Sequence, residues 1–286
     1  MLLLLFVALP FILIFLLSKC KNGGKNTLPP GPIGLPFIGN LHQYDTLNPH
    51  LYFLKLSKKY GKIFSFKLAS AQVVVVSSAK LAKENVLVAG SDTSAAATVW
   101  AMTALIKNPK AIKKVQTEIR KSVGKRGIVN EEDVQNMPYL KAVIKEIFRL
   151  YPPSPILVPR ESMEKTILEG YEIQPGTIVH VNAWAIGRDP EIWENPEEFI
   201  PERFLNSDID YKGQDFELLP FGAGRRGCPG IALGVASMEL ALSNLLYAFD
   251  WELPYGVKKE DIDTNVRPGI TMHKKNELCL IPKNYL

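Results

Sequence analysis

The fold of this protein is decided by residues 221–230, which read FGAGRRGCPG. The glycines in this stretch let the backbone turn tightly and approach a flat partner closely. Pro229 suits the first turn of a helix, and the apolar residues 231–249 that follow predict one. Cys228 therefore lies at the positive end of a predicted helix dipole, where a metal-binding thiolate is favoured. Arg226 supplies a fixed positive charge for an acidic group on a bound cofactor.

Cys228 also has a simpler explanation, because a free cysteine is usually a buried structural residue. The surrounding ten residues favour the ligand over that alternative. The other cysteines of the chain are Cys20 and Cys279. Their odd number and wide spacing argue against a disulfide framework, and no Cys/His cluster in the sequence indicates zinc. The cysteines therefore fit a reducing compartment.

The composition is that of a globular chain with a substantial core. Of 286 residues, 47% are hydrophobic and 22% are charged, which excludes the compositional signature of disorder. The net charge of +5 is spread along the chain. Because there is no long run of Lys or Arg, we expect no binding to nucleic acid.

The first 17 residues are apolar, and lysines follow at positions 19, 21 and 25. This length is at the short end of a membrane span, and the positive flank predicts that the chain after it is cytoplasmic. A cleaved signal peptide and an interfacial helix are the alternatives, and the lack of a basic residue before the run argues against the former. We therefore predict a transmembrane anchor, an N-terminal helix, at 1–17. A linker and proline-rich strap follow at 18–40.

The rest of the chain is predicted to be mainly α-helical with small β-sheets. Residues 41–84 are expected to form an N-terminal helix and β-strand region, and residues 85–286 a larger helical region. A closing β-hairpin is expected from 271–273 and 278–281. The expected helices span 49–60, 80–85, 86–106, 109–121, 139–150 and 231–249, and the other expected strands span 63–68, 72–77, 166–168, 171–173 and 177–181.

The long apolar helix expected at 86–106 contains a polar group at residues 89–94 (AGSDTS). One explanation is a solvated stripe whose hydroxyl groups bond back to the previous helical turn. The other is a functional site, because a positioned hydroxyl beside a titratable acid can deliver protons. Asp92 and Thr93 are the residues that would deliver them.

Together these patterns resemble the cytochromes P450. Residues 221–230 match the haem-binding signature FxxGxRxCxG of that family at every fixed position, and the resemblance implies a cytochrome P450-like fold. It also implies that Cys228 is the thiolate ligand to the iron of haem b (iron protoporphyrin IX). The other residues that the resemblance assigns to the cofactor are Phe221, Gly222, Gly230, Arg226, Arg160, Ala89 and Gly90.

A second family motif concerns the core. Glu146 and Arg149 form the family's ExxR, and their spacing of three places them on one helix face. Residues 201–204 (PERF) resemble the segment whose arginine, here Arg203, joins that pair. The resemblance implies a buried network that locks the core behind the haem rather than one that takes part in chemistry.

The polar segment at 89–94 resembles the part of the family that lies across the distal haem face. There Gly90 leaves room for dioxygen, and Asp92 and Thr93 are the catalytic residues that deliver protons. Arg160 resembles the arginine that contacts a haem propionate. Both assignments come from the resemblance.

The resemblance implies a monooxygenase of the microsomal, plant-type branch, which acts in secondary metabolism. Such an enzyme inserts one oxygen atom from dioxygen into a small apolar substrate. Electrons come from NADPH through an NADPH-cytochrome reductase. The expected location is the endoplasmic reticulum membrane, with a single N-terminal anchor and the bulk of the chain cytosolic.

The sequence departs from the family by a gap near Asn85. Family members carry a domain-sized block between the first strands and the distal helix, and this block forms much of the substrate roof. The fold is therefore expected to be incomplete, with an apolar distal face open to water. The alternative is a non-catalytic truncated remnant that binds haem weakly or not at all. A family member that rearranges its substrate without dioxygen is a third possibility, against which the Asp92-Thr93 pair argues.

Overall fold

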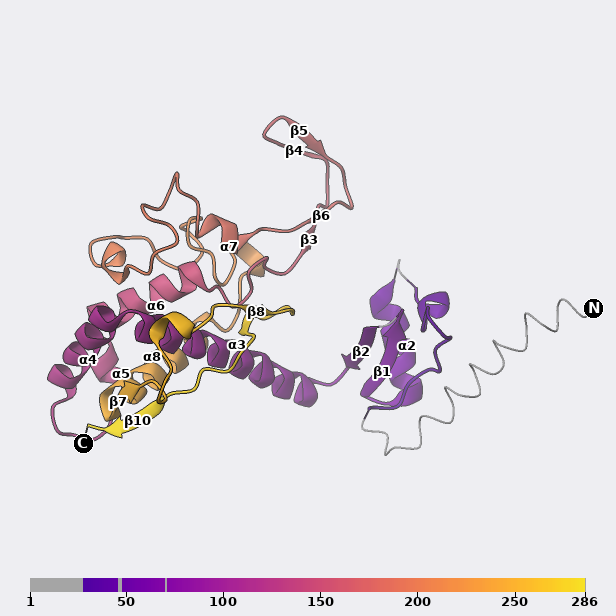
Figure 1. Cartoon of the computed structure of the whole chain (residues 1–286). Helices are drawn as coiled ribbons and strands as arrows, with labels where there is room; N and C mark the ends of the chain where they lie inside the picture. The colour runs from indigo at the N-terminus through magenta and orange to yellow at the C-terminus, as the bar shows by residue number, and fades with distance from the viewer. Residues whose placement is uncertain (1–27, 46–47, 70, 286) are drawn as a thin grey trace, which may run out of the picture. The chain divides into compact units, whose positions relative to one another are not determined.

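The computed structural model describes residues 28–45, 48–69 and 71–285. The predicted anchor at 1–17 lies outside the described residues and stays a prediction. The chain divides into two compact units, Met1–Val88 and Ala89–Leu286 (Figure 1).

The first unit is a small α/β element built on aromatic packing. Helix α2 (Pro49–Tyr60) has proline in its first turn and ends at Gly61, whose φ is 102°. Strands β1 (Ile63–Leu68) and β2 (Ala71–Val76) form an antiparallel pair, close to the predicted strand pair. Leu56, Phe64 and Phe66 form its buried core. A 3-10 turn, η1 (Leu41–Gln43), precedes α2.

The proline-rich strap is bonded to β1 rather than being a free spacer. The backbone N–H of Ser65 donates to the carbonyl of Pro30 at 2.9 Å, and the Lys67 N–H donates to Asn40 Oδ1 at 2.8 Å. A Cβ on Gly31 would lie 1.6 Å from the Ser65 carbonyl oxygen. Only glycine allows the strap to pass so close to the strand.

The second unit is mainly helical. Proline occupies the first turn of α4 and of α6, where its missing N–H costs nothing. The two helices begin at Pro109 and Pro138, and their predicted positions are confirmed to within two residues. The helices and 3-10 turns are α3 (Ala79–Lys107), which begins in the first unit, α4 (Pro109–Val123), α5 (Glu131–Val134), α6 (Pro138–Leu150), α7 (Ala183–Ile186), η2 (Pro201–Phe204), η3 (Gly224–Arg226), α8 (Ile231–Ala248) and η4 (Lys259–Asp261).

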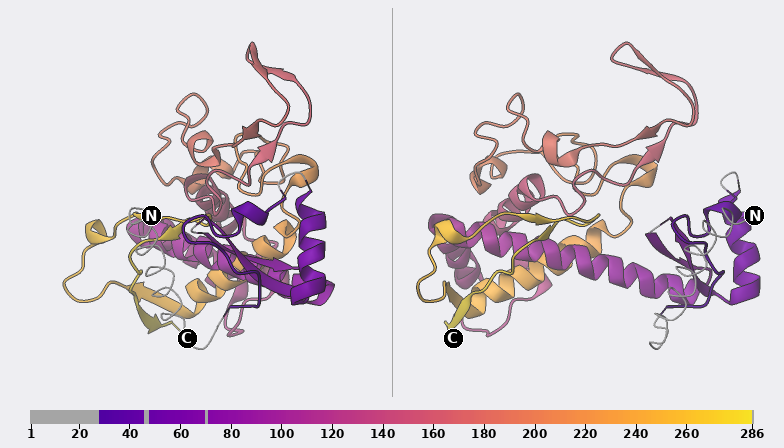
Figure 2. Two further views of the ribbon diagram at one scale, coloured as in Figure 1. Left: turned by 90° about the vertical axis from the view of Figure 1, so that its right-hand side faces the viewer. Right: turned by 45° about the vertical axis from the view of Figure 1, so that its right-hand side comes forward.

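One hydrophobic core holds these helices together. It is contributed mainly by α3, α4, α6 and α8, which gather on one side of the unit (Figure 2). Helix α8 is the one helix among the described residues that is long and apolar enough to cross a membrane. Its residues Val235, Met238, Leu242 and Leu246 are buried in the core. One face of α8 therefore packs into the core of the second unit.

The strands of the second unit form two-stranded antiparallel pairs. Strands β4 (Thr166–Leu168) and β5 (Tyr171–Ile173) make the hairpin that projects from the rest of the unit in Figures 1 and 2. The other pairs are β3 (Arg160–Glu161) with β6 (Ile178–Val179), β7 (Phe249–Glu252) with β10 (Ile281–Asn284), and β8 (Val266–Arg267) with β9 (His273–Lys274).

One expectation about the elements is wrong, and the bounds of another are refined. Residues 271–273 and 278–281 do not form a hairpin together, because β9 pairs with β8 and β10 pairs with β7. The expected helices at 80–85 and 86–106 are one helix, α3. No proline interrupts this stretch, and an isolated glycine such as Gly90 does not end a helix.

Candidate functional site

The Cys228 side chain lies exposed at the start of α8. Its backbone N–H donates to the Phe221 carbonyl at 2.9 Å, which closes the 221–228 loop. The Gly230 backbone N–H donates to Cys228 Sγ at 3.4 Å. Gly230 is the N-cap of α8, so the sulfur receives an N–H group at the positive end of the helix.

Glycine geometry keeps this loop open around the sulfur. Gly222 and Gly224 both have φ of 68°, a left-handed conformation that side-chain-bearing residues avoid. A Cβ on Gly230 would lie 3.8 Å from Cys228 Sγ and would fill space beside it. The roles that the sequence assigned to Gly222 and Gly230 are thus compatible with their backbone.

The structure brings Arg160 to this loop and leaves Arg226 exposed. Arg160 Nη2 donates to the Ala223 carbonyl at 3.0 Å, across 63 residues of sequence. Arg226 belongs to the short turn η3 and is exposed. Within the described residues it has no ion-pair or hydrogen-bond partner, so its charge is available to an anion.

Phe221 anchors the loop in the core. Its ring packs edge-on against Phe148 at 5.1 Å and against Tyr211 at 5.8 Å. Burial raises the pKa of Tyr211 to about 12, and the nearby carboxylates of Glu239 and Asp210 act in the same direction. The packing of the Phe221 ring against Phe148 and Tyr211 fixes the position of the loop.

The polar segment of α3 is exposed at its start. Ala89 and Gly90 are exposed, and a Cβ on Gly90 would have open space around it. Asp92 Oδ2 lies 3.1 Å from His273 Nε2. Thr93 Oγ1 donates to the Ala89 carbonyl at 2.9 Å, the back-bonding that the sequence offered as the simpler explanation.

Helices α3 and α8 approach each other near these residues. A Cβ on Gly234 would lie 3.8 Å from Ser94 Oγ. Gly234 is in the first turn of α8 and Ser94 follows Thr93, so the polar segment and Cys228 belong to the same end of α8. Leu233 beside Gly234 is 64% exposed, which leaves an apolar surface there for a flat ligand.

These residues fit a prosthetic group that brings most of its own metal ligands. In residues 28–45, 48–69 and 71–285, no group of three or more His, Cys, Asp or Glu side chains could hold a metal ion. Cys228 is an exposed sulfur with an N–H donor beside it. A porphyrin iron needs only an axial ligand from the chain, and Cys228 could supply it.

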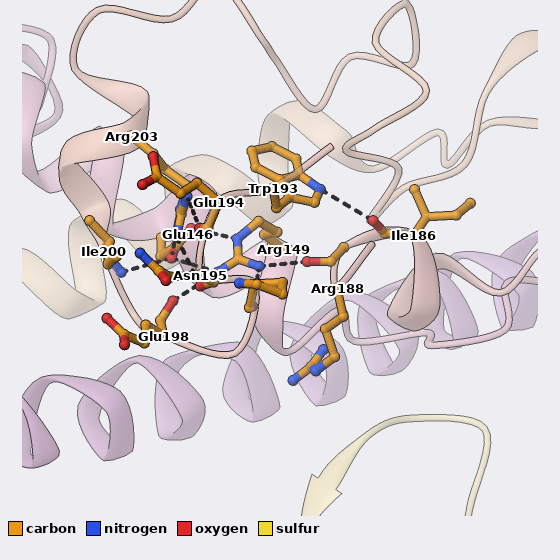
Figure 3. Close-up of polar contacts among 12 residues, drawn as sticks. Glu146, Arg149, Ile186, Arg188, Trp193, Glu194, Asn195, Glu198, Ile200 and Arg203 are labelled. Atoms are coloured by element: carbon orange, nitrogen blue, oxygen red, sulfur yellow. Dashed lines mark hydrogen bonds and ion pairs between the residues drawn. The ribbon is translucent and has the colours of Figure 1, made fainter. Parts of the chain in front are cut away.

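The predicted core network is present behind this site (Figure 3). Arg149 Nε and Nη2 donate to the two carboxylate oxygens of Glu146, both at 2.8 Å, and both side chains are fully buried. Arg203 Nε donates to Glu146 Oε1 at 3.1 Å. Arg149 also donates to the carbonyls of Gly187 and Pro196, at 2.5 Å and 2.7 Å.

Two members of this network were missed in the sequence. A Cβ on Gly187 would lie 2.3 Å from the Arg149 carbonyl oxygen. Any residue with a side chain would therefore clash with the Arg149 backbone at this position. The Trp193 ring lies 5.3 Å from the Arg149 guanidinium carbon. Neither residue has a spacing that points to Arg149, and only the folded chain brings them together.

His273 is the third residue that the sequence did not indicate. It lies 181 positions from Asp92, on a strand that was expected in another pairing. In the sequence, His273 is followed by two lysines. Such a basic run is common on solvated surfaces and does not by itself indicate a site.

Comparisons with known proteins identify the family of this chain. The sequence matches the family model "Cytochrome P450" over residues 29–87 and 84–280. The family model matches in two stretches rather than one, and these overlap at residues 84–87. The overlap is close to the gap expected near Asn85. Together they cover most of the chain.

Curated relatives match at more than half identity. The 5-OH-xanthotoxin synthase of Pastinaca sativa is 53% identical over 223 residues, 76% of this chain and 44% of the relative. Cytochrome P450 71A1 of Persea americana is 55% identical over 197 residues, 69% of this chain and 39% of the relative. The chain thus spans less than half the length of the relatives it matches.

Solved structures match in fold. A zebra fish cytochrome P450 structure with abiraterone has a TM-score of 0.59 and 34% sequence identity. The match covers 67% of this chain and 44% of that structure. Since the family model matches well over half of this chain, these findings lead to one conclusion: the chain belongs to the cytochrome P450 family.

Proposed function

We propose that this chain is a haem-thiolate monooxygenase whose axial ligand is Cys228. The observation that carries the proposal is the exposed Cys228 sulfur, which accepts a hydrogen bond from the Gly230 N–H at the start of α8. The reaction would insert one oxygen atom from dioxygen into a small apolar substrate. The names of two relatives, 5-OH-xanthotoxin synthase and 6,7,8-trihydroxycoumarin synthase, describe hydroxylated small molecules and support this class.

Several residues would hold the haem. Cys228 would bind the iron, and the Gly230 N–H would stabilise the negative charge on its sulfur. Arg160 and Arg226 are the cations that would meet the haem propionates, with Gly222 leaving the loop open next to Arg160. When bound, the haem supplies the chemistry of dioxygen activation, to which a thiolate ligand contributes electron density.

The polar segment of α3 would handle protons. Asp92 carries a titratable carboxylate, and Thr93 carries the hydroxyl next to it. In this structure the Thr93 hydroxyl donates to the Ala89 carbonyl, so it would rotate away from that bond to donate a proton. Ala89 and Gly90 present no bulky side chain there and would leave space for dioxygen.

The partners follow from the same proposal. Electrons would come from NADPH through an NADPH-cytochrome reductase, as membership of the cytochrome P450 family suggests. The apolar residues 1–17 would anchor the chain in the endoplasmic reticulum membrane, with the bulk of the chain on the cytosolic side. No interaction with nucleic acid is proposed.

A second function, a non-catalytic remnant, is favoured by two observations. The two stretches that match the family overlap at residues 84–87, and the match covers only 44% of the length of 5-OH-xanthotoxin synthase. Apolar side chains are exposed on the segments that surround the Cys228 loop and β9. These are Ile156 (49%), Val158 (73%), Leu233 (64%) and Ile270 (84%). A site open to water supports oxidation chemistry poorly.

The proposal is tested by isotopic turnover. The full chain is placed in lipid vesicles with haem and a plant NADPH-cytochrome reductase, and is given a coumarin and isotopically labelled dioxygen. The hydroxylated coumarin that forms should carry one labelled oxygen atom. The reaction should require NADPH, and Cys228→Ala should abolish it, whereas the exposed Cys279→Ala should not. Weak or absent haem binding, with no oxygen incorporation over a panel of small aromatic substrates, would instead support the remnant.

A further inference from the structure

We propose that His273 is the positioning residue for Asp92, and this inference rests on the proposed function. His273 Nε2 lies 3.1 Å from Asp92 Oδ2. When the ring nitrogen donates, this hydrogen bond holds the carboxylate in one direction on α3. The role of His273 would be to keep Asp92 oriented for proton delivery through the neighbouring Thr93.

The backbone on both sides of His273 is clamped. The preceding residue, Met272, accepts a hydrogen bond from Trp100 Nε1 at 2.6 Å and donates its N–H to the Pro153 carbonyl at 2.8 Å. Both bonds are within the second unit. Trp100 lies two turns beyond Asp92 on α3, so the same helix that carries the carboxylate also fixes the strand that carries the histidine.

The residue after His273 is fixed as well. Lys274 Nζ lies 3.1 Å from Asp263 Oδ2, and the Lys274 side chain is 4% exposed. Asn276 donates to the same carboxylate at 3.1 Å. Because side chains alternate along a strand, burial of Met272 and Lys274 leaves His273 to point the other way, toward Asp92.

The pair is placed for function more than for stability. The side chains of His273 and Asp92 are 38% and 51% exposed, and exposed pairs contribute little to folding free energy. Yet three separate hydrogen bonds fix the residues on either side of His273. A rigid donor of this kind suits the orientation of a carboxylate whose direction matters.

The test compares His273→Ala with His273→Gln in the full chain. Glutamine keeps an N–H donor for Asp92, whereas alanine removes it. Hydrogen exchange of the α3 backbone amides after Asp92 is the readout that needs no turnover. His273→Ala should speed exchange there by about twofold to fivefold, and His273→Gln should restore most of the protection. His180→Ala, at another exposed histidine, is the matched control and should leave exchange unchanged.

The second readout is the amount of product formed per NADPH consumed. His273→Ala should lower this ratio at least about threefold, and His273→Gln should recover most of it. Equal exchange in His273→Ala and His180→Ala would overturn the proposal, as would faster exchange with an unchanged product ratio. If the wild-type chain does not turn over, the proposed function fails, and the exchange measurement alone decides whether His273 holds Asp92.

Discussion

The chemistry proposed for Cys228 depends on its place in the chain more than on the cysteine itself. The glycines before it predict a loop with unusual backbone angles, and Gly222 and Gly224 have them. The direction of the Thr93 hydroxyl and the contact between Asp92 and His273 could not be predicted. A side-chain rotamer and a partner 181 residues away depend on packing that local sequence does not encode.

The buried network yields a prediction about single residues. Glu146→Gln leaves the fully buried Arg149 without its charge partner and weakens the contact to Arg203. We expect the free energy of unfolding to fall by about 3–5 kcal/mol, measured by urea denaturation.

The control for this change is a pair with the same chemistry on the surface. Lys165 Nζ lies 2.7 Å from Glu172 Oε1, and both side chains are more than half exposed. Glu172→Gln should change the free energy of unfolding by less than about 1 kcal/mol. If both variants lose the same small amount, the network does not lock the core.

At the scale of elements, the sequence predicts helices better than strand pairs. Apolar periodicity and first-turn prolines are local signals, and they locate α2, α4 and α6 closely. Strands β8, β9 and β10 are two to four residues long, too short for a periodic pattern. Their pairing depends on the tertiary fold: β10 pairs with β7, the strand that follows α8, and β9 pairs with β8. The expected closing hairpin was therefore wrong.

The β8–β9 hairpin should be sensitive to acid. Hydrogen bonds from Asn276, the Asn265 N–H and Lys274 lower the pKa of Asp263 to about 2. A carboxylate with a lowered pKa stabilises the fold above its ordinary pKa near 4 and loses that contribution as the pH falls toward 2. Exchange of the hairpin amides should therefore speed up over this pH range, beyond the intrinsic effect of pH.

Asp263→Asn is the variant that checks this assignment. It should weaken the hairpin at neutral pH and remove most of the additional dependence between pH 4 and 2. An unchanged acid response in this variant would mean that another carboxylate is responsible.

At the scale of the whole molecule, the chain is a cytochrome P450 that covers 39% of Cytochrome P450 71A1. The sequence predicted the family, the loop that carries Cys228 and the buried network. The second unit has a hydrophobic core of its own. The buried network and the Cys228 loop both pack on this core, so they form together. The exposed apolar side chains around this loop are what a missing roof would leave, and the transcript sequence around Asn85 would show whether that block is encoded.

The most direct test of the account is the absorption spectrum of the ferrous, CO-treated chain reconstituted with haem. We predict the red-shifted band of a thiolate-ligated haem in the wild type and in Cys279→Ala, and its loss in Cys228→Ala. A band that survives in Cys228→Ala, or a wild-type chain that binds haem without ever giving this band, would contradict the assignment of Cys228 as the iron ligand.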